Sequence, residues 1–316
     1  MEVIGQAGPP ALQNRHLRRI LEQHAAWLAD NAVGLRANLS GQTLNDVQLA
    51  GANLTDAVLA STTWIEADLT EAVLIRTDLK RADFRSAVLS RADLSGAHLD
   101  ETKMPRAWMT GANLTEATLH QSNLKGANLN EARLLEVNAA DCDFSESKLH
   151  GASAHQSRFF QCQFNEALLE NALFYHVRIE FTTFLGASAA GVSFVSGVVR
   201  DCRFDRAEMP GAKFYRADLE RSSLCNVRLP DSDFREANLT SAELCGTDLT
   251  GCRFGGARMQ GADFRRANLK GARELTADQL MRARTDQSTI LPNGSFGPYS
   301  RRSRAERPLS PGRADD

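Results

Sequence analysis

The chain has 316 residues, enough to bury a large core, and its 37 basic and 39 acidic residues leave a formal net charge of −2. This near-balance favours neither a dedicated nucleic-acid binder nor a polyanionic tail. No stretch approaches the roughly 18 apolar residues of a membrane span, and the N-terminus lacks a secretory signal. A cytoplasmic protein is therefore the simplest interpretation, and the sequence leaves export as an effector open.

The N-terminal segment, residues 1–35, contains an amphipathic pattern. Within residues 11–30, the apolar and aromatic side chains on one helical face are Leu17, Ile20, Leu21, His24, Trp27 and Leu28. We expect a helix that covers one end of the repeat that follows, with partner binding as the alternative role. His24 on that face is interpreted as a packed histidine rather than a ligand.

Residues 36–272 repeat every five positions. From Leu39 to Leu269, each fifth residue is almost always Leu, Phe or Met, and the residue two before it is small, with Gln42 as the exception. Two inward residues separated by an outward one predict a very short strand. Pro105, Pro210 and Pro230 directly follow repeat centres, where proline suits the start of a turn. The pattern predicts a solenoid of short sides and corners.

The number of sides per coil follows from two phenylalanine ladders. Phenylalanine recurs at intervals of twenty in both ladders, one over 144–204 and the other over 174–254. Like residues stack along the axis of a solenoid, so twenty residues, or four sides, should make one coil. The prediction is an all-β solenoid, a quadrilateral β-helix of about twelve coils with short capping helices at both ends.

Several repeat units resemble a known family. Runs such as RANLS, GANLT, EADLT, KRADF and SRADLSGAHL resemble the A(D/N)LXX consensus of the pentapeptide-repeat proteins, over about three quarters of the chain. The resemblance implies a right-handed quadrilateral β-helix, and the handedness comes only from this source. Middle units such as VRIEF, ASAAG and GVVRD depart from the consensus at the Asp/Asn position, so the fold there depends on register.

The C-terminal part divides into two predicted segments. In residues 273–297, the T-x-x-Q capping box from Thr276 to Gln279 predicts a short helix over about 277–284 that covers the second end. Residues 298–316 are rich in Arg, Ser and Pro and are predicted to be disordered. Their arginines could contact nucleic acid or a membrane surface, but a solvated tail is the favoured interpretation.

The repeat contains no sequence motif typical of a catalytic or metal-binding site. Nucleophile-elbow, zinc-protease and phosphate-loop motifs are missing from the sequence, and no cysteine spacing suggests zinc. Four cysteines fill the small inward slot, whereas Cys225 and Cys245 follow repeat centres and should stack one coil apart at the surface. Their redox state is left open. We expect no enzyme activity, cofactor or metal, because an insertion-free rod supplies no loops to build a pocket.

Two binding functions compete. The first is a rigid scaffold whose outer walls bind an unidentified protein partner, with homodimerisation as one form of that contact. The second is DNA mimicry, since some family members bind type II topoisomerases such as DNA gyrase. Mimicry needs a continuous acidic stripe, but basic residues interrupt every wall and the last coils turn basic. The scaffold is therefore preferred, and nucleic acid is not the expected partner.

The scaffold interpretation has a candidate surface. Outward apolar and aromatic residues gather on one wall and its adjoining corner, and such a gathering often marks a protein contact. The candidate residues are Leu135, His155, Phe160, Leu173, Tyr175, Phe181, Val195, Val198 and Tyr215. The alternative is that they are ordinary isolated surface residues or are covered by another part of the chain.

Overall fold

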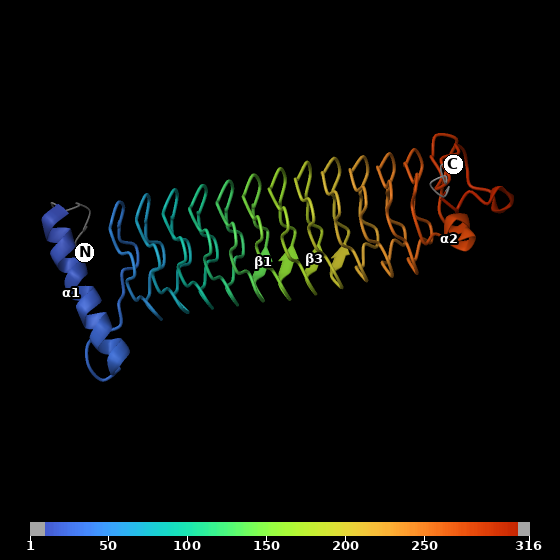
Figure 1. Cartoon of the computed structure of the whole chain (residues 1–316). Helices are drawn as coiled ribbons and strands as arrows, with labels where there is room; N and C mark the ends of the chain where they lie inside the picture. Colours follow the sequence, from blue (N-terminus) through green and yellow to red (C-terminus); the bar gives the residue numbers. More distant parts are fainter. Residues whose placement is uncertain (1–9, 309–316) are drawn as a thin grey trace, which may run out of the picture.

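The computed structural model describes residues 10–308, with side chains from residue 15 on. It shows a rod of stacked coils with α1 at one end and α2 at the other (Figure 1). The elements in chain order are α1 (Pro10–Ala29), β1 (Asn138–Ala140), β2 (Arg158–Phe160), β3 (Arg178–Glu180), β4 (Val198–Arg200), α2 (Ala277–Arg282) and the 3₁₀ helix η1 (Arg301–Ser303). None of the described helices is long and apolar enough to cross a membrane.

The coils are joined by parallel backbone pairing. From the Asn38–Val58 bridge to the Arg253–Arg273 bridge, each pair joins residues twenty apart, which is the interval that the phenylalanine ladders predict. Twenty residues hold four five-residue units, and we call each stack of units twenty residues apart a wall. The strands β1 to β4 lie on one wall, in the order β1-β2-β3-β4.

A dry apolar column fills the rod. The repeat centres and the small residues two positions earlier are buried almost throughout. Within the first phenylalanine ladder the rings stack, as in Phe164 and Phe184 with centroids 5.0 Å apart. The second ladder stacks in the same way and meets the first edge to face, as in Phe184 and Phe194 at 6.1 Å and 81°. Such geometries suit the ring quadrupole, so the column gains more than simple burial.

The corners are tight turns whose second residue has a positive φ. At the proline corners, Arg106, Gly211 and Asp231 follow the proline with φ of 57°, 67° and 57°. The backbone N–H of the next residue donates to the centre's carbonyl, for example Ala107 to Met104 at 3.1 Å. Proline first and a positive φ second is the pattern of a type II turn, so the predicted placement of proline is confirmed.

The N-terminal helix α1 packs on the first coil. Leu17 and His24 are buried, and Ile20 and Leu21 pack against the core. The His24 Nδ1 atom accepts a hydrogen bond from the backbone N–H of Ala37, with 3.1 Å between the nitrogens. This bond fixes the end of the helix to the first residue of the column. His24 is therefore a packed histidine, as predicted.

The C-terminal end is covered by α2 and the segment after it. Thr276 and Gln279 form the predicted capping box. The Gln279 Nε2 atom also donates to the carbonyls of Phe254 and Ala257, at 2.8 and 3.0 Å. It thereby satisfies the Ala257 carbonyl, because the equivalent carbonyl on earlier coils accepts a backbone N–H from the next coil. The Phe254 carbonyl already accepts the Ala257 N–H and gains a second bond.

Residues 298–308, which the sequence analysis assigns to a disordered tail, make defined contacts in the structure. Tyr299 packs against the core, its hydroxyl donates to Glu306 at 2.8 Å, and Ala305 is fully buried. Arg301 forms an ion pair with Asp278 on α2. These contacts give the segment a tertiary partner that its composition does not reveal. The rest of the predicted tail, residues 309–316, lies outside the described residues.

Candidate interaction surface

Two aromatic side chains protrude from the corner that follows the β1–β4 wall. Phe160 ends β2, and Phe181 directly follows β3 on the next coil. Their side chains are 40% and 54% exposed, and their rings meet edge to face with centroids 5.6 Å apart. Most phenylalanines of this chain are buried, so an exposed, mutually packed pair is unusual for the rod.

A second pair lies on the corner at the other side of the same wall. The rings of His155 and Tyr175 are 4.9 Å apart and half-buried. Burial, reinforced by the positive charge that His176 can carry, holds the pKa of His155 below its ordinary value. The ring is therefore neutral at pH 7, and it packs as an aromatic group. We call Phe160, Phe181, His155 and Tyr175 the aromatic patch.

The other predicted surface residues lie around the aromatic patch. Half-buried positions on neighbouring units of this surface are Leu135, Leu173, Val195 and Val198. Between the two aromatic corners, the wall itself presents Arg158 and Arg178. Arg178 forms an ion pair with Glu180 at 2.8 Å, whereas Arg158 has no ion-pair partner within residues 15–308. The surface is thus apolar at its two corners and basic between them.

Tyr215, the last residue of the predicted surface, has charged neighbours of its own. Its hydroxyl donates to Glu236 at 3.1 Å, and the guanidinium groups of Arg216 and Arg235 lie 5.0 and 5.6 Å from its ring centroid. The side chain is held in a cation–π and hydrogen-bonded cluster of its own. Its place two coils beyond Tyr175 was predicted, but its engagement with charged neighbours was not.

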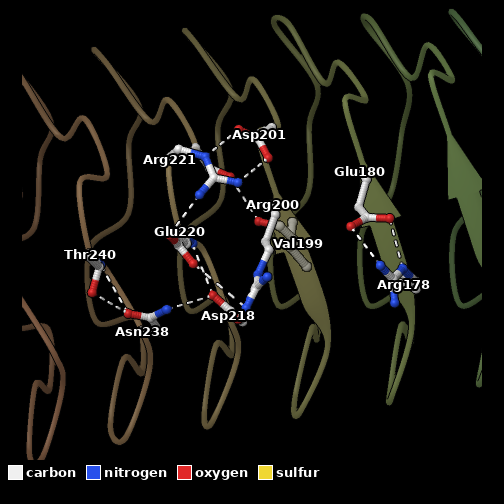
Figure 2. Close-up of polar contacts among 11 residues, drawn as sticks. Arg178, Glu180, Val199, Arg200, Asp201, Asp218, Glu220, Arg221, Asn238 and Thr240 are labelled. Atoms are coloured by element: carbon white, nitrogen blue, oxygen red, sulfur yellow. Dashed lines mark hydrogen bonds and ion pairs between the residues drawn. The ribbon is translucent and has the colours of Figure 1, made fainter.

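A charged network borders the aromatic patch on the later coils. Figure 2 shows Arg200, at the end of β4, beside Asp218, and Arg221 between Asp201 and Glu220. The Arg200 Nε atom donates to Asp218 at 2.8 Å, and Arg221 contacts Asp201 at 2.8 Å and Glu220 at 2.7 Å. The hydrogen bonds from Arg221 hold the pKa of Asp201 below its ordinary value. Because Asp201 occupies the corner position of Phe181 one coil later, the apolar surface ends in a polar rim.

An open depression lies on the next wall. Its volume is about 510 Å³, and its lining includes Phe181, Asp201, Arg221, Ser223 and Cys225. The lining is mostly charged, and its arginine and aspartate side chains are already paired. No group of three or more metal-binding side chains occurs among the described residues.

The recurring outward Asp and Asn residues serve the turns. The Asp68 Oδ1 atom accepts the backbone N–H of Thr70 at 2.9 Å, and Asn113 accepts that of Thr115 at 3.2 Å. Side-chain acceptance two residues on is a standard way to stabilise a turn. Turn stabilisation therefore accounts for the recurring Asp or Asn of the repeat, and no catalytic role is needed to explain it.

Two exposed aromatic residues, Trp108 and Phe296, lie outside the predicted surface, and Trp108 is the one on a wall of the rod. Trp108 is 56% exposed on a different wall and lies beside Val88 and Asn128 in the ladder. The signal was present in the sequence, since Trp108 stands between the inward residues Ala107 and Met109 and so had to point outward.

Comparisons with solved structures return other repeat proteins. HetL, a pentapeptide repeat protein involved in heterocyst differentiation regulation in Nostoc sp. strain PCC 7120, is 24% identical, with 85% of this chain and 97% of that chain covered and a TM-score of 0.28. Rfr23 from Cyanothece 51142 is 27% identical over 45% and 93%, with a TM-score of 0.28. QnrB1, a plasmid-mediated fluoroquinolone resistance protein, is 20% identical over 60% and 89%, with a TM-score of 0.27.

No curated protein matches the chain significantly. The family assignment depends on the sequence models instead. The family described as pentapeptide repeats matches in eight copies, over residues 36–63, 52–91, 92–130, 112–151, 122–159 and 232–271. The related pentapeptide repeat region matches residues 157–234. The chain therefore belongs to the pentapeptide repeat family.

Proposed function

We propose that this chain is a non-enzymatic scaffold that binds a protein partner through the aromatic patch. The observation that carries the proposal is the exposed Phe160–Phe181 pair on a wall whose backbone is hydrogen-bonded to the coils on both sides. Aromatic anchors on a preorganised surface lose little entropy on binding. The proposal includes the right-handed, four-sided helix of about twelve coils that the family resemblance implies, and a cytoplasmic location.

The chemistry of the surface defines the kind of partner. The two exposed rings call for an apolar side chain. The guanidinium of Arg158, which has no ion-pair partner among the side chains that the structure describes, calls for a carboxylate next to it. The paired charges around Arg221 would form the wet rim of such an interface. A second copy of this chain is one protein that could supply these groups.

DNA mimicry is less well supported because the surface charge is compensated from coil to coil. Duplex DNA carries a negative charge about every 1.7 Å along its axis. Here, carboxylates on one coil are paired with arginines at the same corner one coil away. Examples of such pairs twenty residues apart are Arg76–Asp56, Arg91–Glu71, Arg81–Glu101, Arg216–Glu236 and Arg221–Asp201.

The proposal is tested by replacing Phe160 and Phe181 together by Ser. The matched control is Trp108→Ser, which removes an equally exposed aromatic ring from another wall. The Phe double variant should bind the partner recovered with the wild type at least about 10-fold more weakly, whereas the control should bind normally. Titration of the purified pair and sedimentation velocity measure partner binding and self-association. Unchanged values in both assays would refute the role of the patch. A separate supercoiling assay tests the alternative function: inhibition of DNA gyrase by the protein would favour mimicry.

A further inference from the structure

The surface cysteines Cys225 and Cys245 form a disulfide between adjacent coils. They occupy the same corner position twenty residues apart, with their Cα atoms 4.7 Å apart. This separation lies inside the range that a disulfide spans without backbone movement. Both side chains are half-buried, and Cys225 also lines the open depression described above. The pair is therefore both correctly spaced and reachable from solvent.

The two coils do not depend on the disulfide for their stacking. Backbone N–H groups pair them directly on either side of the bond, Leu224 to the Glu243 carbonyl at 2.7 Å and Asn226 to the Cys245 carbonyl at 2.9 Å. The column beneath is closed by buried Leu224 and Leu244. Reduction would thus leave two thiols held face to face by a scaffold that stays folded.

The remaining cysteines provide an internal comparison. Cys142 and Cys162 are also twenty residues apart, but both are about 1% exposed and both are free. Cys202 and Cys252 are buried and free as well, and burial raises the pKa of Cys202 to about 12. All four of these thiols are at most about 1% exposed, so a reagent in solvent does not reach them in the folded chain. Thiol chemistry in the folded chain is confined to Cys225 and Cys245.

We propose that Cys225 and Cys245 form a reversible redox site that exchanges with small disulfides while the rod stays folded. In the oxidising direction, one thiolate attacks a small disulfide RSSR, forms a mixed disulfide and releases RS⁻. The second thiolate then attacks the protein sulfur of that mixed disulfide and releases the second RS⁻. The two cysteines lose two electrons, RSSR gains them, and the two thiol protons go to the departing thiolates. A dithiol reductant reverses both steps.

The test uses the full chain, reduced with dithiothreitol and then exposed to oxidised glutathione as the probe. Native alkylation followed by intact mass and peptide analysis should label Cys225 and Cys245 in the reduced protein and neither after oxidation. The four buried cysteines should react only after denaturation. Circular dichroism should be the same in both states, and hydrogen exchange over the coils around residues 205–265 should change only locally.

Two variants separate the site from ordinary thiol chemistry. Cys225→Ser should stop at a stable mixed disulfide with one glutathione, because the resolving thiol is missing. Cys142→Ser with Cys162→Ser, the buried pair at the same spacing, should behave like the wild type. The proposal is overturned if the native pair resists both reagents, if reduction unfolds the neighbouring coils, or if oxidation joins separate chains instead of closing the Cys225–Cys245 bond.

Discussion

Phe194 lies at a crowded point of the aromatic column. Its ring stacks between Phe174 and Phe214, with centroid distances of 5.2 and 5.4 Å. The edges of Phe184 and Phe204 meet it at 6.1 and 5.9 Å. Replacing Phe194 by Ala removes four aromatic contacts and leaves a cavity in the middle of the rod.

The expected loss of stability follows from these contacts. Removing a buried phenylalanine costs about 3–5 kcal/mol, depending on how far the surroundings collapse. Each aromatic pair adds about 0.5–1.5 kcal/mol beyond burial. Collapse is restricted here, because the Phe194 N–H donates to the Lys213 carbonyl and the adjacent Ser193 N–H donates to the Ala172 carbonyl. These bonds hold the wall to the coils on both sides. We therefore expect the upper part of the range, about 4–5 kcal/mol.

Chemical denaturation followed by circular dichroism measures the total loss, and hydrogen exchange shows where it falls. Because each coil contacts only its neighbours, protection should decrease most near residues 174–214. Phe264→Ala is the control, since that ring has a single aromatic neighbour, Phe254, at 6.2 Å, and should lose about 3 kcal/mol. Equal losses for the two variants, or a Phe194→Ala loss below about 1 kcal/mol, would refute the reasoning.

Two further predictions concern the ends of the rod. Burial lowers the pKa of His24 in the folded chain. As the pH falls, the unfolded chain therefore gains the proton on this histidine first, near pH 6.5. The N-terminal cap should lose stability as the pH falls below that value. Hydrogen exchange of residues 15–30 at pH 5 and pH 7.5 measures this, and His24→Gln, which cannot ionise, should weaken the difference. At the other end, Thr276→Ala removes the side-chain cap of α2 and should cost about 0.5–2 kcal/mol by thermal denaturation, with exposed Ser288→Ala as a neutral comparison.

The repeat could be followed from the sequence because its physics is local and periodic. Each five-residue unit has a small residue, an outward residue and a large residue, followed by a turn. Only one arrangement of such units brings all the large side chains together. The ladder interval could be read from Phe144 and Phe164 because rings stack on rings. Thr276 and Gln279 predicted α2 because a capping box is also local: it satisfies backbone groups within one helical turn.

The side-chain contacts of the surface and of the C-terminal segment could not be predicted from the sequence. Tyr215 occupies the predicted corner, but Arg235 reaches it from a different coil, and such long side chains choose partners by rotamer rather than by repeat position. The sequence of the segment with Tyr299 and Ala305 is polar and proline-rich, yet half-buried Tyr299 packs against the core and Ala305 is buried. The accessibility of Cys225 likewise depends on the depression beside it.

The uninterrupted twenty-residue pairing has a mechanical consequence. Each coil advances by one hydrogen-bonded strand spacing, about 4.8 Å, so groups on one corner are separated by whole multiples of that step. The rod is in effect a molecular ruler with graduations set by its backbone. Deleting one whole coil would bring two docking points one graduation closer without rotating either, whereas deleting five residues would turn one of them to a different face.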